Sequence, residues 1–342
     1  MISMLKAGII GMGKMGQIRK REIDAHPGFE LVALCDQHPP VLDKYSSLPV
    51  FSDWSELLSL DLDVIFVCTY NNVAPDIVCA GLNSGCHIFC EKPPGSSVAD
   101  VKRIIAAEKA AGDRILKFGF NHRFHYAIME AKAIIDSGRY GQVLWARGLY
   151  GKAGGLTFQD NWRSDQSLAG GGILLDQGIH MLDLMQHFLG DFVEVKGFVE
   201  NLYWNKIPLE DNAFALMKTA QGKVAMVHSS ATQWKHKFSL DVFMQDGYLC
   251  VNGLLTSTRS YGDESLTFAK KQFEDESRAF GRPREETIFF DTDDSWRLEL
   301  EEFYDSIIGK SKQWNGDSSD ALKVMELVTQ IYEEAEKHHN PA

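Results

Sequence analysis

Apolar and polar positions follow a regular rhythm over the first third of the chain. Largely apolar runs alternate with segments in which apolar residues recur every three or four positions, as in an amphipathic helix. The runs cover 5–10, 31–35, 64–69, 87–90 and 115–118, and the helical segments cover 14–25, 73–83 and 98–111. Continuous apolar strands are typical of parallel sheets buried on both faces. The alternation therefore predicts a parallel, doubly wound sheet, in which ligands bind beyond the carboxyl ends of the strands.

The pattern changes after residue 124. Helices are expected at 126–137 and 178–188 and a strand at 142–150, followed by strand-like segments at 192–199, 212–218, 223–229, 238–245 and 248–251. Strands without helices between them predict an antiparallel sheet, and Gln221-Gly222 and Asp246-Gly247 are typical hairpin turns. Two helices, at 295–308 and 319–337, are expected to close the chain. The predicted fold class is α/β, with an N-terminal Rossmann dinucleotide-binding domain at 1–122 and a C-terminal α+β domain at 123–342 that has an open, mostly antiparallel sheet.

The first apolar run ends in a glycine-rich turn that leads into the first expected helix. Gly11, Gly13 and Gly16 match the pattern G-x-G-x-x-G. In dinucleotide-binding folds the first glycine forms the tight turn, the second lets the backbone approach a pyrophosphate, and the third lets helix and strand pack closely. The helix N-terminus adds unpaired N–H groups and the positive end of its dipole. The residues expected at the cofactor are these glycines with Met12, Lys14 and Met15.

A carboxylate follows at the distance that this fold requires. Asp36 ends the second apolar run, about 20 residues after Gly16, where a dinucleotide fold places the acid that accepts from ribose hydroxyls. We expect NAD rather than NADP, because a carboxylate repels the 2′-phosphate and no arginine follows in Gln37-His38. The alternative is an ordinary glycine turn and a solvated aspartate. It is disfavoured because strand, glycine turn, helix and acid follow one another in the order that a dinucleotide fold requires.

Composition limits the class of protein and of partner. The chain has 342 residues, 44% hydrophobic and 24% charged, which is typical of a globular protein with two domains of ordinary size. A formal net charge of −12 disfavours nucleic acid as a partner. We find neither a signal-peptide pattern nor an apolar run of the roughly 18 residues that a membrane helix needs. Six cysteines, none in a C-x-x-C pair, favour free thiols. We therefore expect a cytoplasmic protein that acts on a small molecule.

Two further motifs carry a resemblance to a known family. Glu91-Lys92-Pro93 follows the fourth long apolar run, and residues 170–183 read G-G-G-I-L-L-D-Q-G-I-H-M-L-D. With these motifs behind a dinucleotide fingerprint, the chain resembles the glucose–fructose oxidoreductase / inositol dehydrogenase / rhizopine catabolism (Gfo/Idh/MocA) family. The resemblance covers the whole chain in layout. It implies an NAD(P)-dependent oxidoreductase of carbohydrate metabolism that acts on a ring hydroxyl of a sugar, nucleotide-sugar or inositol.

The resemblance also implies roles for individual residues. The catalytic set would be Lys92, Asp176 and His180. The cofactor would be lined by Gly11, Gly13, Gly16, Asp36, Thr69, Asn71, Glu91, Lys92 and Asn121. The substrate would meet Lys92, Arg123, Trp162, Arg163, Asp176 and His180. In this family the C-terminal sheet often forms a subunit interface, which implies a homodimer or homotetramer.

This sequence departs from the family pattern in two places. Proline is replaced by Tyr70 in the T-P-N segment, and a histidine common three residues after the asparagine is Ala74. The backbone near the nicotinamide ribose is therefore expected to differ. Some relatives do other chemistry, so two alternatives stay open: a glycosidase that uses bound NAD transiently, and a regulator that binds the cofactor without turnover.

The residue types agree with alcohol oxidation. His180 can accept the hydroxyl proton near neutral pH, and Lys92 can stabilise the developing alkoxide. Asp176 lies four residues before His180, so one helical turn would let the carboxylate orient the imidazole, although Gly178 predicts a bent or starting helix.

Plainer interpretations compete at the same positions. His180 can be a satisfied core histidine, Lys92 a surface lysine, Trp162 core and Arg163 a surface cation. A helix face that carries Asp176, His180, Asp183 and His187 can also hold a metal, but no cysteine or second histidine cluster supports this, and we expect none. Lys152, Arg163 and Lys235 are cations that can meet an anionic group of the substrate.

Overall fold

The computed structural model describes residues 4–38, 43–45, 47–272, 283–312 and 315–339. The chain divides into two compact units. The first comprises residues 1–121, 167–170 and 296–325, and the second comprises residues 122–166, 171–295 and 326–342. No helix within the described ranges combines the length and the apolar character needed to cross a membrane.

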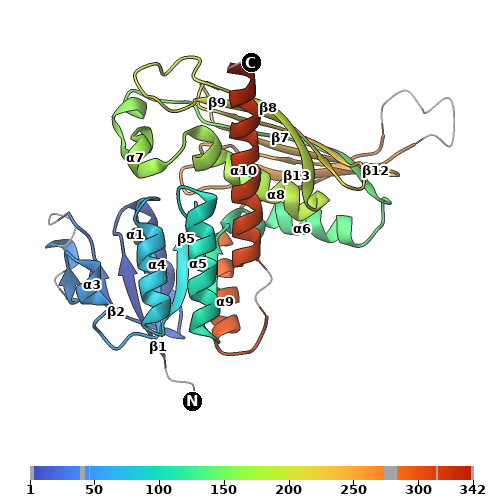
Figure 1. The fold of residues 1–342 in the computed structure, drawn as a ribbon. Helices are drawn as coiled ribbons and strands as arrows, with labels where there is room; N and C mark the ends of the chain where they lie inside the picture. Colours follow the sequence, from blue (N-terminus) through green and yellow to red (C-terminus); the bar gives the residue numbers. More distant parts are fainter. Residues whose placement is uncertain (1–3, 39–42, 46, 273–282, 313–314, 340–342) are drawn as a thin grey trace. The chain divides into compact units, whose positions relative to one another are not determined.

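The first unit contains a parallel sheet of six strands in the order β3-β2-β1-β4-β5-β6 (Figure 1). The strands are β1 (Leu5–Ile10), β2 (Phe29–Cys35), β3 (Val50–Phe51), β4 (Val64–Val67), β5 (His87–Glu91) and β6 (Leu116–Gly119). The predicted doubly wound parallel sheet is confirmed. The strand order reverses between β1 and β4, so the carboxyl ends of these two strands form the switch point where such sheets bind dinucleotides.

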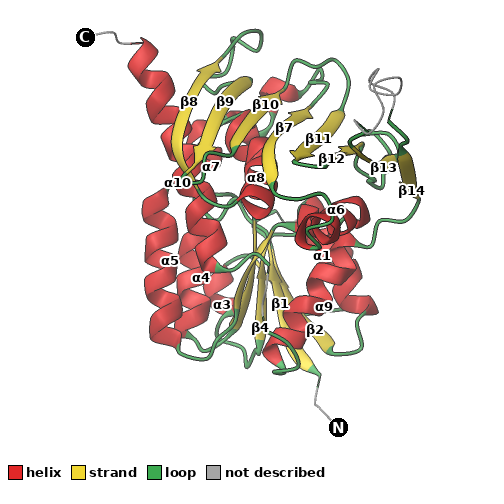
Figure 2. Ribbon diagram, turned by 90° about the vertical axis from the view of Figure 1, so that its right-hand side faces the viewer, coloured by secondary structure: helices red, strands yellow, loops and turns green. Residues whose placement is uncertain are grey.

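Helices cover both faces of this sheet. They are α1 (Lys14–Ala25), α3 (Trp54–Leu57), α4 (Ala74–Asn83), α5 (Val98–Ala111) and α9 (Ser295–Ile307). Figure 2 shows α4 and α5 on one face and α9 on the other. Local signals set the limits of α5, because the Ser97 side chain accepts from the Asp100 N–H at its start and Gly112 takes a φ of +71° at its end.

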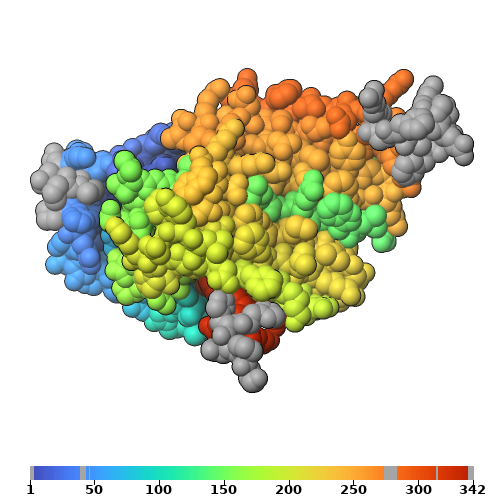
Figure 3. All heavy atoms as spheres, turned by 90° about the horizontal axis from the view of Figure 1, so that it is seen from above, coloured from blue at the N-terminus to red at the C-terminus, as the bar shows by residue number. Residues whose placement is uncertain are grey.

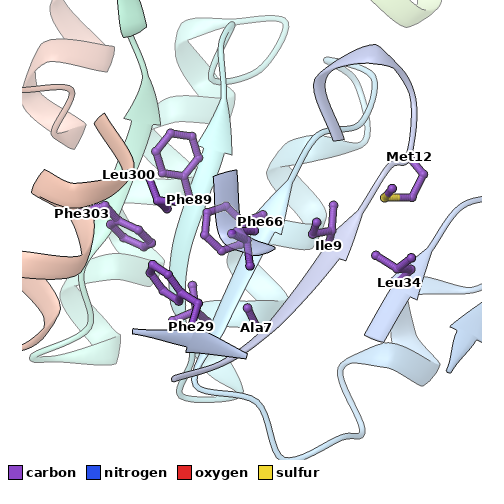
Figure 4. Packing of buried hydrophobic residues seen from close by; sticks show 11 residues of the cluster. Ala7, Ile9, Met12, Phe29, Leu34, Phe66, Phe89, Leu300 and Phe303 are labelled. Carbon is purple, nitrogen blue, oxygen red and sulfur yellow. The ribbon is translucent and has the colours of Figure 1, made fainter. Parts of the chain in front are cut away.

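Helix α9 completes the core of the first unit. Its Leu300 and Phe303 are buried against Phe66 and Phe89 of the sheet (Figure 4). The sequence places residues 123–342 together in the second domain, whereas contacts assign 296–325 to the first unit. The reason is this packing, since the apolar face of α9 is buried only when it covers the sheet.

The second unit contains an eight-stranded sheet in the order β14-β13-β12-β11-β7-β10-β9-β8. The strands are β7 (Val143–Gly151), β8 (Phe192–Glu200), β9 (Asn212–Thr219), β10 (Val224–Ser230), β11 (Lys237–Met244), β12 (Gly247–Asn252), β13 (Glu264–Lys270) and β14 (Glu286–Phe290). Neighbours pair antiparallel except β7 and β10. The mostly antiparallel sheet is confirmed, as are both hairpin turns. Strands β3, β13 and β14 were not expected.

In the described part of the second unit, helices lie against one face of the sheet. They are α6 (Tyr126–Asp136), α8 (Ile179–Leu189) and the second half of α10 (Ser318–His339). The single turn α7 (Gln166–Ala169) belongs mostly to the first unit. A β-carbon on Gly148 of β7 would come within 2.3 Å of the Met181 sulfur, which shows how closely α8 packs. No helix of the described residues lies against the opposite face, which is here called the open face. Figure 3 views the molecule from above, and in it green atoms lie between yellow and orange atoms.

Candidate functional site

The three glycines of the first turn have different surroundings. Gly11 has a φ of +93°, and a β-carbon there would lie 2.4 Å from the Cys68 carbonyl oxygen at the end of β4. A β-carbon on Gly16 would lie 2.0 Å from the Gly11 carbonyl oxygen. A β-carbon on Gly13 would meet no atom within 4 Å. The turn is therefore closed around Gly11 and Gly16, whereas at Gly13 the backbone is open to an approaching pyrophosphate.

Asp36 lies beside this turn, directly after β2. Its Oδ2 accepts from the Met12 N–H at 2.7 Å, and its Oδ1 accepts from the His38 N–H at 2.9 Å. Each carboxylate oxygen has a second lone pair, so both can still accept from the hydroxyls of a ribose. The residues present thus fit an adenosine ribose at Asp36 and a pyrophosphate over Gly13, next to the N-terminus of α1.

The other cofactor residues expected in the first unit follow the strand ends. Thr69 and Asn71 follow β4, and the buried Asn71 side chain donates from Nδ2 to the Ala169 carbonyl at 2.7 Å. The Lys92–Pro93 peptide bond after β5 is cis. Asn121 is buried shortly after β6. These residues all lie at the carboxyl edge of the parallel sheet, as expected, and their roles at the cofactor stay a prediction.

A buried arginine holds the end of strand β5. Arg19 of α1 is fully buried, and its Nε donates to Glu91 at 2.7 Å while its Nη2 donates to Glu299 of α9 at 2.5 Å. Its guanidinium carbon lies 4.0 Å from the ring centre of Phe89 and 4.7 Å from that of Trp296. Burial disfavours the charged guanidinium, but Glu91 and Glu299 outweigh it and raise the pKa of Arg19.

This arrangement gives Glu91 a structural partner that the sequence reasoning missed. The signal was present, because Gly16, Arg19 and Ile23 share the buried face of α1 at helical spacing. An arginine on an apolar face needs a buried carboxylate. Glu91 therefore anchors the strand end that carries Lys92.

In the second unit, Asp176 is held between two cations. It lies in a π-helical turn, Leu174–Gly178, which precedes α8. The Lys152 Nζ is 2.5 Å from its Oδ2, and the Arg163 Nε is 3.0 Å from its Oδ1. The Arg163 guanidinium also lies over the Trp162 ring, 4.4 Å from its centre. The structure thus brings together three residues expected at the substrate, Trp162, Arg163 and Asp176, and adds Lys152.

These groups line a cavity of about 180 Å³. Its polar lining includes Lys152, Arg163 and Asp176, and its apolar lining includes Phe158, Ile207 and Leu209. A few convergent polar groups on an apolar wall are typical of small-molecule sites. The cations donate and the carboxylate accepts, which suits a compound with several hydroxyl groups.

Glu210 supports the segment that leads to Asp176. It accepts from the backbone N–H groups of Gly172 and Leu174 at 2.9 and 3.0 Å and from the Tyr332 hydroxyl at 2.8 Å. Burial raises the pKa of Glu210, and these hydrogen bonds oppose the shift. The carboxyl group fixes the backbone two residues before Asp176.

His180 lies in the first turn of α8 and is 4% exposed. Its ring stacks on the ring of His122 with 3.7 Å between centres and 16° between planes. The His122 Nε2 is 2.8 Å from the Tyr150 hydroxyl, and burial raises the pKa of Tyr150 well above its usual value, which keeps the phenol neutral. Neither His122 nor Tyr150 was assigned a role from the sequence, although His122 lies among the polar residues that follow the 115–118 strand.

Arg123 and Asp183 form a buried ion pair. The Arg123 Nε and Nη2 donate to the two Asp183 oxygens at 2.8 and 2.5 Å. Asp183 was considered above as a metal ligand. Over the ranges of the chain that the structure describes, no group of three or more histidine, cysteine or acidic side chains is placed to hold a metal ion.

The convergence of the catalytic set stays a prediction. Lys92 belongs to the first unit, and Asp176 and His180 belong to the second. The pairing of Asp176 with His180 is likewise a prediction, whereas the ion pairs of Asp176 with Lys152 and Arg163 are observed.

Comparisons with known proteins agree in both units. The model of the oxidoreductase family with an NAD-binding Rossmann fold matches residues 5–120, and the model of the GFO/IDH/MocA C-terminal domain matches residues 128–250. Inositol 2-dehydrogenase of Salmonella typhimurium is 30% identical over 226 residues, which are 64% of this chain and 65% of the relative. D-glucoside 3-dehydrogenase of Escherichia coli is 31% identical over 55% of each chain. The chain thus spans about 65% or less of the length of these curated relatives.

Solved structures share the fold at lower identity. Levoglucosan dehydrogenase in complex with NADH is 21% identical, with a TM-score of 0.83 over 97% of both chains. Aldose-aldose oxidoreductase from Caulobacter crescentus is 22% identical, with a TM-score of 0.83 over 98% of both chains. At this identity the likeness supports the fold alone.

Proposed function

Because the chain belongs to the Gfo/Idh/MocA oxidoreductase family, we propose that it is an NAD-dependent dehydrogenase for a ring hydroxyl of a sugar, nucleotide-sugar or inositol. The observation that carries the proposal is the open backbone at Gly13 beside the carboxylate of Asp36, which fits a dinucleotide without a 2′-phosphate. The cavity at Asp176, with its donors and acceptor, supports a substrate with several hydroxyl groups. The dehydrogenases named above support the same class.

The roles of the residues follow from the chemistry of alcohol oxidation. Bound NAD⁺ supplies the acceptor for the hydride that leaves the carbinol carbon. His180 accepts the hydroxyl proton, and Lys92 donates to the oxygen as it becomes a carbonyl. Asp176 accepts from a substrate hydroxyl and is itself held by Lys152 and Arg163. The products are a ketone, NADH and a proton.

A substrate panel tests the proposal directly. Inositols, free sugars, methyl glycosides and nucleotide-sugars are incubated with NAD⁺ and the full-length protein, and NADH absorbance is followed. We expect NADH from at least one ring polyol. Cleavage of an aryl glycoside with constant total NAD would point to the glycosidase instead, and NADH binding without turnover of any compound would point to a regulator.

His180→Ala tests the proton acceptor on the best substrate of that panel. Loss of a general base lowers turnover by about 10²–10⁴-fold. NADH binding, measured by its fluorescence, is expected to stay within twofold. Unchanged turnover would remove His180 from the mechanism.

The open face of the second sheet supports assembly with a second copy of the chain. Along β9 the buried Ala213, Ala215 and Met217 alternate with the exposed Phe214 and Leu216. Exposed apolar side chains on neighbouring strands extend the same surface, among them Phe198, Val224 and Met226. A contiguous apolar surface of this kind marks an interaction site. A homodimer or homotetramer through this face is part of the proposal.

The cysteines support a reducing compartment. All six are free thiols in the structure, and free thiols without disulfides are usual in the cytoplasm. A cytoplasmic location is therefore also proposed.

A further inference from the structure

Four aromatic side chains of the second unit form a cluster, and three of them lie outside the lining of the cavity described above. Phe158, Tyr203, Trp204 and Trp234, here called the aromatic platform, contact one another with ring centres 4.8–6.2 Å apart. Tyr203 is 57% exposed and Trp234 is 59% exposed. Large aromatic side chains that gather on a surface in this way mark a binding site, because a ligand that covers them removes apolar area from water.

The loop that carries Tyr203 is held in place by a buried carboxylate. Asp211, which is fully buried, accepts from the backbone N–H groups of Leu202, Tyr203 and Trp204 at 2.8–2.9 Å. The loop backbone is therefore fixed before any ligand arrives, which lowers the entropic cost of binding.

Trp204 is the fixed base of the platform. Its indole Nε1 donates to the Ala231 carbonyl at 3.0 Å. A β-carbon on Gly154 would lie 2.4 Å from its ring, so only glycine allows the ring to pack there. Trp204 thus braces Tyr203 and Trp234, whose outer surfaces face water.

Trp234 has a backbone conformation that bulky residues avoid. Its φ is +54°, in the left-handed region. A residue with a side chain is strained in this conformation, and such positions concentrate at functional sites. A strained position that presents an exposed indole supports a role in binding.

The platform continues the wall of the cavity that holds Asp176. Phe158 lines the cavity and also contacts Trp204, with 5.0 Å between ring centres. Ile207 and Leu209, which follow Tyr203 on the same loop, line the cavity as well. The cavity measures about 180 Å³, below the roughly 300–1,000 Å³ of sites for larger ligands. It therefore suits one sugar-sized ring, and any larger substrate must extend beyond it.

We propose that the aromatic platform is a subsite for a second pyranose ring, so that the preferred substrate is a disaccharide or a longer glycoside. This inference rests on the proposed function, because the first ring would occupy the cavity at Asp176. A pyranose ring has an apolar face of C–H groups that packs flat on an aromatic ring, while its hydroxyls point outward from the edge. The planes of the exposed Tyr203 and Trp234 rings lie 77° apart, so each ring offers its own face, at an angle to the other, to such a sugar ring.

The test compares disaccharides with the methyl glycosides of their terminal sugars. Maltose, cellobiose, lactose and melibiose are compared with methyl glucosides and methyl galactosides by NADH formation with the full-length protein. We expect kcat/KM for at least one disaccharide to exceed that of its methyl glycoside about tenfold. In Trp234→Ala and Tyr203→Ala this ratio is expected to fall about tenfold, whereas Trp234→Phe keeps most of it because a ring remains.

Phe289→Ala is the matched control, since Phe289 is 73% exposed on β14 of the same unit and lies outside the platform. It is expected to leave the ratio unchanged. No disaccharide preference in the wild type, or equal effects of the platform variants on both substrate classes, would overturn the subsite. Loss of a dimer or tetramer in Trp234→Ala would show instead that the platform contacts a second copy of the chain.

Binding without turnover separates this inference from the proposed function. Binding of the same disaccharides is followed by the quenching of tryptophan fluorescence, which we expect whether or not NADH forms. In Tyr203→Ala the affinity for the disaccharide is expected to fall about tenfold. If inositols or monosaccharides yield NADH but no disaccharide binds better, the subsite alone is wrong. If no compound is oxidised yet the disaccharides still bind at the platform, the dehydrogenase proposal alone is wrong.

Discussion

The glycines of the first turn differ in what an added methyl group would meet. At Gly16 the methyl group would overlap the Gly11 carbonyl, whereas at Gly13 it would enter open space. Gly13 also has a φ of −64°, which any residue adopts. Protein packing therefore requires glycine at Gly16, while only a ligand would require it at Gly13.

This difference gives a prediction for two alanine variants. Gly13→Ala is expected to weaken NADH binding by about tenfold or more with an unchanged melting temperature, because the methyl group occupies the path of the pyrophosphate. Gly16→Ala is expected to lower both the affinity for NADH and the melting temperature, because it distorts the turn. NADH fluorescence titration and thermal unfolding measure the two effects. Full NADH affinity in Gly13→Ala would contradict a pyrophosphate at this position.

Asp36 combines a structural and a recognition role. Its Oδ2 holds the Met12 N–H of the glycine turn, so a test of recognition must keep an acceptor there. Asp36→Asn removes the charge and keeps the side-chain oxygen. We expect the wild type to bind NAD more tightly than NADP, and the ratio of the two Kd values to fall about tenfold in Asp36→Asn, because the repulsion of the 2′-phosphate is lost. Tighter binding of NADP in the wild type would show the assignment to be wrong.

At the scale of elements, helix α9 brings a buried carboxyl group as well as apolar side chains into the first unit. Glu299 of α9 is fully buried, and burial raises its pKa to about 7, with Arg19 and Lys117 opposing the shift. In the unfolded chain the pKa of a glutamate is about 4.3. The folded state therefore holds this proton more tightly. The protonated carboxyl therefore makes its full contribution to the free energy of unfolding below about pH 4. This contribution is lost as the pH rises to about 7.

Glu299→Gln tests this linkage, because an amide does not titrate. Between pH 5 and 8 the free energy of unfolding of the wild type is expected to fall relative to that of the variant, by on the order of 2–3 kcal/mol. Urea unfolding followed by tryptophan fluorescence measures it. Glu301→Gln, on the exposed side of the same helix, is the control. A difference between wild type and Glu299→Gln that does not vary with pH would contradict the buried, protonated carboxyl.

Elements differ in how far local pattern predicts them. Helices α1 and α5 were expected at their observed limits, since apolar periodicity lies within each segment itself and Ser97 and Gly112 flank α5. Strand β14 was not expected, because its side chains are mostly exposed and alternation is absent. It is a strand because it pairs with β13 at the edge of the sheet. Likewise, Gly178 predicted a bent or starting helix. The structure has a π-helical turn at this place, directly before α8.

At the scale of the whole molecule, the open sheet face predicts the state of assembly. Phe214 and Leu216 on this face are 38% and 51% exposed in the single chain. If a second copy covers them, Leu216→Glu buries a charge against an apolar surface, which opposes association. We expect the dissociation constant to rise at least about hundredfold, measured by analytical ultracentrifugation.

Met129→Glu, on helix α6 and outside this face, adds the same charge and is expected to leave the assembly unchanged. A wild-type protein that is monomeric at micromolar concentration would show that the face has another role.

The sequence by itself determined the two-part architecture, the glycine turn and the place of Asp36. These features follow from the order and spacing of residues within short segments, which apolar periodicity and turn residues show directly. Only the tertiary structure decided that Arg19 holds Glu91, that Lys152 and Arg163 hold Asp176, and that His122 stacks on His180. These partners belong to different elements, and their contacts arise from the packing of one element on another, which a local sequence pattern does not contain.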